Sequence, residues 1–257
     1  MLDKRIGAQL FTLRDYCKTI EDFETTCKKL DEIGYKMLQI SAVGPTDGAQ
    51  LKSAADKYSL ETTVTHCSAD KYVNDLNGII KYHNDLGCKI AGLGCMPDIA
   101  NFSEEKLYDF IKIYNVISKT LKDNGITFAY HNHSVEFRKI KGKYVIDILL
   151  ENTDADSFKL IFDTYWASYA GINPADFIKN HKGRIICTHF KDLAVTNVKD
   201  IIMAPVGEGN LDWDKIIDAC NESEIKYAYV EQDNCNGEDP FDCMKRSYEF
   251  LTKKGFC

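Results

Sequence analysis

Short apolar runs recur along the chain, and each is rich in the β-branched and aromatic residues that favour strands. Between them lie longer segments in which apolar residues return every three or four positions, as in amphipathic helices. The runs predicted as strands are Ile6–Phe11, Met37–Ser41, Thr62–His66, Ile90–Gly94, Ile126–Tyr130, Leu160–Phe162, Ile185–His189 and Tyr227–Glu231. The clearest predicted helices are Ile20–Ile33, Leu51–Tyr58, Leu76–Leu86, Leu107–Leu121 and Phe241–Leu251.

Capping residues support this alternation of strand and helix. Ser103 precedes one predicted helix, and Asn173-Pro174 opens another with a proline suited to the first turn. Glycines of the kind that end helices in a left-handed cap stand just before strands: Gly34, Gly87 and Gly125. Eight strand–helix units of about 30 residues predict an α/β protein with a closed (β/α)8 TIM barrel. A doubly wound open sheet is the alternative.

No linker rich in proline, glycine or serine divides the chain, so we expect one TIM-barrel domain over residues 1–257. Two connections are longer than the rest. Phe137–Tyr144 is predicted to form a hairpin or lid after the fifth strand, and Leu193–Asp212 a second excursion after the seventh. Both follow strands, so both belong to the rim where such barrels carry their active sites.

Composition and charge narrow the class of protein. The chain is 44% hydrophobic and 28% charged, as expected of a folded globule. Its formal charge of -7 argues against nucleic acid as the main partner, because that affinity comes mostly from basic residues. No apolar run is long enough to cross a membrane, and Met1–Arg5 lacks a signal-peptide core. We therefore expect a cytoplasmic protein.

The ten cysteines contain no C-x-x-C pair, and several lie within apolar strand or helix patterns. We interpret them as buried free thiols of a reducing compartment rather than as a disulfide framework.

Ionisable residues end three successive predicted strands. Asp163, His189 and Glu231 each follow a short apolar run. Any one of them alone is readily explained as a loop residue or a hydrogen-bonded buried group. Three in register predict a metal site across the mouth of a barrel, and their carboxylate and imidazole ligands suit Mn, Co, Mg or Zn.

The fifth strand supplies the fourth ligand, but its identity stays open. Alternation along the strand points His131 and His133 the same way, and Glu136 follows on the turn. A site made of oxygens plus one histidine favours Glu136. His131 and His133 would then orient it, contact substrate hydroxyls, or serve as hydrogen-bonded structural residues.

Lys191 lies two positions after His189, on the same face if the strand continues. Beside a divalent ion its pKa could fall so that it acts as acid or base, or it could stabilise an enediolate oxygen as a cation. Trp166 could offer its ring to a sugar or simply pack at the rim. As acid, base or cation Lys191 is a candidate catalytic residue, and a plain surface lysine is the alternative.

Three further residues are candidates for substrate binding. Gln9 and His66 lie near strand ends, where a place in the core is the competing interpretation. Glu208 sits in Pro205–Trp213, which is predicted to form a glycine turn leading into a helix capped by Asp212. A solvated turn residue is the alternative for Glu208.

Taken together, these motifs resemble the sugar phosphate isomerase/epimerase family of xylose isomerase-like TIM barrels over essentially the whole chain. They are Ile6–Asp15, Tyr130–His133 with Glu136-Phe137, Phe162–Trp166, His189–Asp192, Gly207–Gly209 and Val230–Asp233. The resemblance implies one divalent ion held by Glu136, Asp163, His189 and Glu231. It also implies ketose epimerase, aldose–ketose isomerase, inosose dehydratase or 3-keto-sugar chemistry, in which polarisation of a carbonyl acidifies the neighbouring C–H bond.

The chain departs from the epimerases at the fifth strand. Those enzymes place a glutamate at the strand end, whereas here His131 stands near that place and Glu136 lies further on. This weakens a symmetric two-glutamate epimerisation and strengthens a dehydratase-like reaction. The endonuclease IV type of DNA repair enzyme is similar in plan, but Trp166 replaces a histidine that it needs, and Gly94-Cys95 offers none at strand four.

We therefore expect a metal-dependent isomerase or epimerase acting on a sugar or polyol through an enediolate, with Glu231, His131, His133 and Lys191 as catalytic candidates. A lyase acting on an inosose or 3-keto-sugar is the alternative. A non-catalytic sugar-binding barrel and a nuclease are more remote. The expected partner is a small sugar or sugar derivative, not nucleic acid or a membrane, and the sequence leaves a homo-oligomer open.

Overall fold

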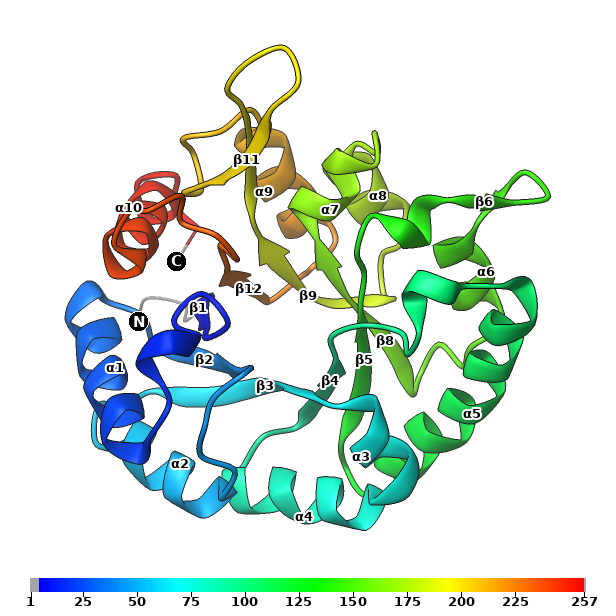
Figure 1. Cartoon of the computed structure of the whole chain (residues 1–257), viewed down its shortest axis with the longest axis horizontal. Helices are drawn as coiled ribbons and strands as arrows, with labels where there is room; N and C mark the ends of the chain where they lie inside the picture. Colours follow the sequence, from blue (N-terminus) through cyan, green and yellow to red (C-terminus); the bar gives the residue numbers. More distant parts are fainter. Residues whose placement is uncertain (1–4, 257) are drawn as a thin grey trace.

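Eight parallel strands close into a barrel in this computed structural model, in the order β1-β12-β9-β8-β5-β4-β3-β2 (Figure 1). They are β1 (Ile6–Gln9), β2 (Met37–Ile40), β3 (Glu61–Cys67), β4 (Ile90–Leu93), β5 (Thr127–His131), β8 (Phe158–Asp163), β9 (Ile185–Phe190) and β12 (Tyr227–Val230). Pairing of β1 with both β12 and β2 closes the ring. The predicted (β/α)8 barrel is confirmed, and the open sheet is wrong.

The structure describes residues 5–256, with only the backbone at residue 100. Residues 1–4 of the amino-terminal segment and Cys257, on which expectations were stated above, lie outside the described residues.

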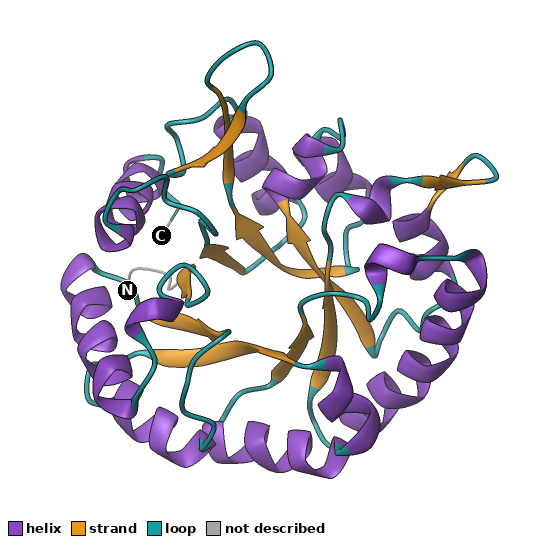
Figure 2. Ribbon diagram, viewed as in Figure 1, coloured by secondary structure: helices purple, strands orange, loops and turns teal. Residues whose placement is uncertain are grey.

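Helices surround the barrel as an outer ring (Figure 2). They are α1 (Ile20–Ile33), α2 (Gly48–Asp56), α3 (Ala69–Asn74), α4 (Leu76–Leu86), α5 (Glu104–Asp123), α6 (Val145–Glu151), α7 (Thr164–Tyr169), α8 (Pro174–Asn180), α9 (Trp213–Glu222) and α10 (Pro240–Lys253), with 3₁₀ turns η1 (Arg14–Tyr16), η2 (Ile99–Asn101) and η3 (Val135–Phe137). Among residues 5–256, no helix has the length and apolar character needed to cross a bilayer.

Local chemistry sets the helix boundaries where the sequence predicts them. The Ser103 side chain accepts a hydrogen bond from the Lys106 amide at the start of α5. Asn173 does the same for two amides of α8, whose first residue is Pro174. Gly87 ends α4 with φ of 75°, a left-handed conformation that glycine adopts without strain.

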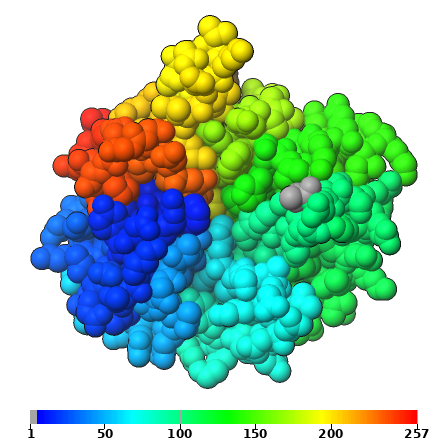
Figure 3. Space-filling model, in the orientation of Figure 1, coloured from blue at the N-terminus to red at the C-terminus, as the bar shows by residue number. Residues whose placement is uncertain are grey.

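Two hairpins leave the rim, where the two long connections were predicted. β6 (Lys139–Ile140) pairs with β7 (Lys143–Tyr144), and β10 (Asp192–Val195) pairs with β11 (Ile201–Ala204). The segment around β10 and β11 protrudes beyond the rest of the outline in the space-filling view (Figure 3).

The described cysteines are free thiols. Six of them are buried, in agreement with their interpretation as small apolar residues: Cys17, Cys27, Cys88, Cys187, Cys220 and Cys243.

The inside of the barrel changes from apolar to polar along its axis. One cluster of buried side chains fills it: Met37, Val64, Ile90, Ala129, Ile161, Cys187 and Tyr229. Because side chains alternate along a strand, the residue two positions further on points to the same interior, one step nearer the carboxyl ends. Those next residues include Gln39, His66, His131, Asp163, His189 and Glu231. The candidate site is therefore the polar layer directly above the apolar core.

Candidate active site

Four buried side chains meet in this polar layer with the donor atoms that bind metals. His131, Asp163, His189 and Glu231 each offer one such atom, and the four atoms lie within 4.8 Å of one another. None is more than 4% exposed. An ion bound at about 2.1 Å by four tetrahedral ligands spaces them about 3.4 Å apart. The group is thus compact enough to surround one ion after small adjustments.

The ring of His131 presents a lone pair to Asp163. His131 Nδ1 lies 3.0 Å from the Gly94 carbonyl oxygen, which can only accept, so Nδ1 carries a proton. In the neutral ring Nε2 then has a lone pair, and it lies 3.1 Å from Asp163 Oδ2. Two electron-rich atoms at that distance need a cation, either a proton on His131 or a metal ion.

His189 repeats this arrangement on the next strand. Its Nε2 lies 2.7 Å from Gln39 Oε1 and donates to it, so Nδ1 is the unprotonated nitrogen of the neutral ring. Nδ1 lies 2.9 Å from Glu231 Oε2. Both atoms are buried and make no hydrogen bond to any described residue. Two buried acceptors that face each other are an arrangement that a bound cation satisfies, and the Lys191 ammonium also lies 3.1 Å from Glu231 Oε2.

Asp163 is oriented by the helix that follows it. Its Oδ1 accepts from the Trp166 amide and caps α7, which leaves Oδ2 facing the histidines. Its own amide donates to Asn132 Oδ1. Hydrogen bonds of this kind fix the direction of metal ligands in proteins. The four donors therefore fit a divalent ion, and imidazole with carboxylate ligands suits Zn, Mn or Co.

The structure places Glu136 away from this group, so its prediction as the metal ligand of the fifth strand is not supported. Glu136 lies in η3, and its carboxylate accepts from the Tyr130 hydroxyl and from the His133 amide. The 3₁₀ turn carries its side chain to the outer side of the strand end, where it is fully buried. The donor that the fifth strand contributes is His131, the last residue of β5.

Lys191 forms ion pairs with three carboxylates. Its Nζ lies 3.3 Å from Asp163 Oδ2, 3.1 Å from Glu231 Oε2 and 2.9 Å from both oxygens of Asp233. Although burial disfavours the charged amine, these acids outweigh it and raise the pKa of Lys191 above its ordinary value. Lys191 therefore stands in the site as a cation, which is one of the two roles expected of it; the lowered pKa expected beside a divalent ion stays a prediction.

The carboxylates respond to the same charges. Burial alone would raise the pKa of Asp163, but Lys191 and His131 outweigh it and hold that pKa below its usual value. Burial would likewise raise the pKa of Glu231, but Lys191 and His189 outweigh it and hold that pKa well below its usual value. Both side chains are therefore charged. Asp233 differs, because burial and the nearby Glu231 raise its pKa to about 6.

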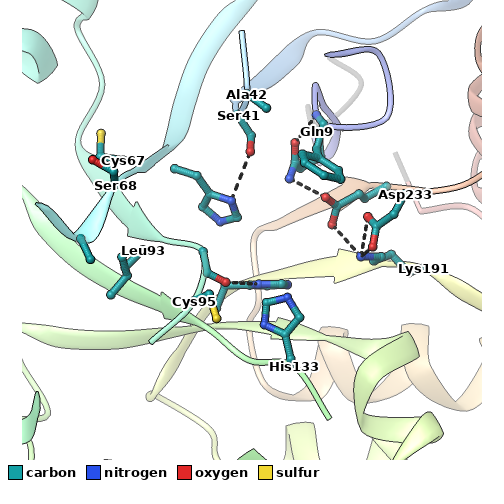
Figure 4. Close-up of a pocket in the computed structure, with 16 residues that line it drawn as sticks. Gln9, Ser41, Ala42, Cys67, Ser68, Leu93, Cys95, His133, Lys191 and Asp233 are labelled. Carbon is teal, nitrogen blue, oxygen red and sulfur yellow. Dashed lines mark hydrogen bonds and ion pairs between the residues drawn. The ribbon is translucent and has the colours of Figure 1, made fainter. Parts of the chain in front are cut away.

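A pocket of about 430 Å³ opens above the cluster (Figure 4). Lys191 and Asp233 lie on one side of it, and Cys67 and Ser68 lie on the other. Gln9 also lines the pocket and donates to Glu231 Oε1 over 2.6 Å. This volume is within the range of small-molecule sites.

His66 and His133 both line this pocket and have unused nitrogens. His66 Nε2 and His133 Nδ1 are buried and have no hydrogen-bond partner among the described residues. Burial and the neighbouring His131 lower the pKa of His133 to about 3, so its ring is neutral near pH 7. Neutral imidazoles facing a pocket can both donate to and accept from substrate hydroxyls.

Two sequence-predicted substrate contacts lie outside the pocket lining. Glu208 is on the surface, where it pairs with Arg246 at 2.7 Å, which is the solvated turn position that was its alternative. Trp166 packs 5.4 Å from the ring of His133 and 5.6 Å from the Lys191 ammonium. The structure thus gives Trp166 the rim-packing position that was its alternative.

Sequence reasoning missed two polar residues that shape the site. Gln39 holds the ring of His189, and the signal was a polar residue in an otherwise apolar buried strand. Asp233 holds Lys191, and its signal was the acidic pair it forms with Glu231 at a strand end.

Comparison with known proteins identifies the type of barrel. Residues 23–254 match the family described as xylose isomerase-like TIM barrel. The chain is 23% identical to an inosose dehydratase of Bacillus cereus (strain AH820) over 203 residues, which cover 71% of this chain and 67% of that protein.

Solved structures share the fold over nearly the whole length. A sugar phosphate isomerase/epimerase from Parabacteroides distasonis ATCC 8503 superposes with a TM-score of 0.85 at 22% identity, covering 100% of this chain and 96% of that one. D-allulose 3-epimerase from Methylomonas sp., in complex with D-allulose, gives a TM-score of 0.72 at 15% identity and covers 98% of each chain.

Proposed function

Since the chain belongs to the xylose isomerase-like TIM barrel family, whose members include epimerases, isomerases and dehydratases, we propose that it is a divalent-metal-dependent lyase that removes water from a keto-sugar or keto-polyol. The observation that carries this proposal is the pairing of a carboxylate and an ammonium, Glu231 and Lys191, which both line the pocket and lie 3.1 Å apart.

His131, Asp163, His189 and Glu231 would hold the ion. When bound, such an ion polarises a carbonyl oxygen and so acidifies the neighbouring C–H bond. Gly94 and Gln39 keep the lone pairs of the two histidines directed at the site. Gln9 fixes the carboxylate of Glu231 from the opposite side.

Glu231 acts as the base that takes the proton next to the carbonyl. Lys191 then donates a proton to the hydroxyl that leaves from the adjacent carbon, and water departs. Because the two groups are neighbours, proton and hydroxyl leave from the same face of the substrate. The proton on Glu231 afterwards passes to the Lys191 amine across the same short contact, and both residues regain their starting charge.

The neutral histidines bind rather than ionise in this scheme. His66 and His133 each direct an unpartnered nitrogen toward substrate hydroxyls. Asp233 keeps the ammonium of Lys191 facing the pocket. An enediolate oxygen that forms beside this ammonium gains electrostatic stabilisation in a buried setting.

Isomerisation or epimerisation is the second candidate, favoured by His133, a second proton carrier that lines the pocket apart from Lys191 (Figure 4). An epimerase must return the proton from the opposite face. Here the opposed carboxylate is absent from the cluster, since Glu136 is bonded to Tyr130, and a histidine would have to take its role.

Reaction in deuterated water with metal-loaded protein separates the two candidates. Inososes, 3-keto-sugars and ketoses such as D-allulose are incubated with the protein, and products are read by mass spectrometry. Loss of one water supports the lyase, whereas an isobaric product carrying solvent deuterium supports the epimerase. Neither product from any of these substrates, with one ion bound per chain, would argue for a non-catalytic barrel.

A further inference from the structure

Three side chains at the end of β1 bind three consecutive residues at the end of β12, its neighbour in the barrel. The contacts run from Gln9 Nε2 to Glu231 Oε1 at 2.6 Å, from the Gln232 amide to Thr12 Oγ1 at 2.9 Å, and from Arg14 Nη2 to the Asp233 carbonyl oxygen at 3.2 Å. The proposed reaction uses only the first of them. The other two join residues 10–14, which have no role in that reaction, to the segment that carries Asp233.

Arg14 contacts both sides of this junction. Its Nη1 donates to the Phe11 carbonyl oxygen over 2.6 Å, and its guanidinium carbon lies 4.3 Å from the centroid of the Phe11 ring. Its Nη2 makes the bond to Asp233. Phe11 and Asp233 both line the pocket, whereas Arg14 is half-buried and is not part of that lining. One guanidinium therefore ties two parts of the pocket wall together.

Asp233 has little else to fix its position. Among residues 5–256 its backbone makes one hydrogen bond, which is the bond from Arg14. Its side chain is 25% exposed, and both carboxylate oxygens lie 2.9 Å from the Lys191 ammonium. The direction in which Asp233 holds that ammonium therefore depends on where Arg14 holds the Asp233 backbone.

An arginine suits this position better than another cation does. The guanidinium is a rigid fork whose nitrogens donate in different directions, and its flat face stacks on aromatic rings. Two different nitrogens of Arg14 bind the two carbonyl oxygens, and its guanidinium lies over the ring of Phe11. A lysine would keep the charge but offers a single nitrogen and no flat face.

Resting on the proposed function, in which Lys191 is the acid, we propose that Arg14 is a positioning residue. It holds the segment that carries Asp233 and thereby directs the Lys191 ammonium toward the substrate. Arg14 itself does not touch the substrate. Its effect is geometric, since a displacement of a catalytic group by about 1 Å can lower a rate about a hundredfold.

Nitrogen-15 NMR of the lysine ammonium groups tests this positioning in the full chain without a substrate. Ammonium protons of exposed lysines exchange rapidly with water, whereas Lys191 is 2% exposed and is held by three carboxylates. The Lys191 signal is identified by its loss in Lys191→Met. We expect Arg14→Met to accelerate the exchange of these protons at least about tenfold, because the carboxylate of Asp233 is released. Arg14→Lys should behave like Arg14→Met.

Arg5→Met is the matched control. Arg5 precedes β1, and it also bonds to two oxygens, Asn221 Oδ1 and the Ile225 carbonyl oxygen, at 2.8 Å each. Its guanidinium carbon lies 4.1 Å from the centroid of the Phe256 ring. These contacts are at the other end of the strand, so their loss should leave the exchange of the Lys191 protons as in the wild type.

Four results overturn the proposal. They are wild-type exchange in Arg14→Met, wild-type exchange in Arg14→Lys, equal acceleration in Arg5→Met, and a wild type in which no slowly exchanging Lys191 signal is seen. The second shows that the charge alone is sufficient, and the third shows a general loosening of the fold.

A second arm measures turnover of the keto-sugars and inososes named above. Arg14→Met is expected to lower the rate of water loss about tenfold to a hundredfold while retaining exchange of the substrate proton for solvent deuterium. Loss of both to the same extent overturns the proposal, because Arg14 would then not act through Lys191. A wild type that releases no water from any of these substrates contradicts the lyase itself. The NMR arm keeps that failure separate, since it requires no substrate.

Discussion

The ammonium of Lys191 lies 3.1 Å from Glu231 Oε2, and both side chains are almost completely buried in the same wall of the pocket. If Glu231 is the base and Lys191 the acid, removing the ammonium should stop the loss of water without stopping proton removal. We expect Lys191→Met to lower the rate of dehydration by about 10² to 10⁴-fold. The variant should still exchange the substrate proton for solvent deuterium.

The control for this prediction is Glu231→Gln, which should lose dehydration and exchange together. Mass spectrometry and proton NMR in deuterated water give both rates from one sample. Loss of exchange and dehydration to the same extent in Lys191→Met would show that the lysine does not act as a separate acid.

The identity of the fifth-strand ligand gives a second prediction. His131 Nε2 faces the cluster, whereas Glu136 is bonded to Tyr130 and to the His133 amide. We expect His131→Gln to weaken binding of Zn or Mn at least about a hundredfold. Glu136→Gln is the matched control and should bind the ion as the wild type does. Competition with a fluorescent chelator measures both affinities, and the reverse order would return Glu136 to the metal shell.

Asp192 supports a third prediction, on stability. Its fully buried carboxylate accepts hydrogen bonds from the amides of Gly207 and Gly209 and from Trp213 Nε1 at 2.8, 3.0 and 2.6 Å. Alanine at this position would leave the buried Trp213 Nε1 and the half-buried amides of Gly207 and Gly209 without this partner. We expect Asp192→Ala to lower the free energy of unfolding by about 3 kcal/mol or more, measured by urea denaturation.

Asp214→Asn is a suitable control for Asp192→Ala, because Asp214 pairs with Lys254 at the surface and its side chain is 71% exposed. Exposed pairs contribute little, so its effect should stay below about 1 kcal/mol. If the two variants are equally stable, the position of the segment that follows β11, at Gly207–Trp213, does not depend on Asp192.

The sequence predicted the barrel because its signals are local. Ile20–Ile33 and Leu76–Leu86 are amphipathic and capped, and the structure begins and ends both helices at those residues. Alternation also placed Asp163, His189 and Glu231 on one interior face, since each follows a core residue by two positions.

The fifth strand shows where local signals fail. Whether Glu136 or His131 reaches the cluster depends on the 3₁₀ turn after β5 and on the hydroxyl of Tyr130. The raised pKa of Lys191 depends on Asp163, Glu231 and Asp233, which approach it from other strand ends. The first depends on the exact conformation of a short turn and the second on contacts between distant strand ends, and the sequence pattern specifies neither.

A fourth prediction concerns His83, which is buried away from the four residues proposed to bind a metal. Its Nε2 lies 2.8 Å from Thr65 Oγ1 and its Nδ1 lies 2.8 Å from the Ile79 carbonyl oxygen. Burial lowers the pKa of His83 to about 4. In the unfolded chain the pKa of this side chain is about 6.5. Between that pH and about pH 4, the unfolded state therefore binds a proton that the folded state does not bind.

The contribution of neutral His83 to the free energy of unfolding should therefore be fully present above about pH 6.5 and be lost as the pH falls toward about 4. Between pH 7 and pH 4.5 the loss due to His83 amounts to about 2 to 3 kcal/mol in the free energy of unfolding. We expect His83→Gln to be less stable than the wild type at pH 7, since the glutamine fits the Thr65 contact less well. Between pH 7 and pH 4.5, however, its free energy of unfolding should fall by about 2 to 3 kcal/mol less than that of the wild type. Asn84→Gln, at an exposed neighbour on α4, should keep the full wild-type loss. Equal pH dependence of the wild type and His83→Gln in urea denaturation would show that His83 is protonated in the folded protein, against its burial between α4 and β3.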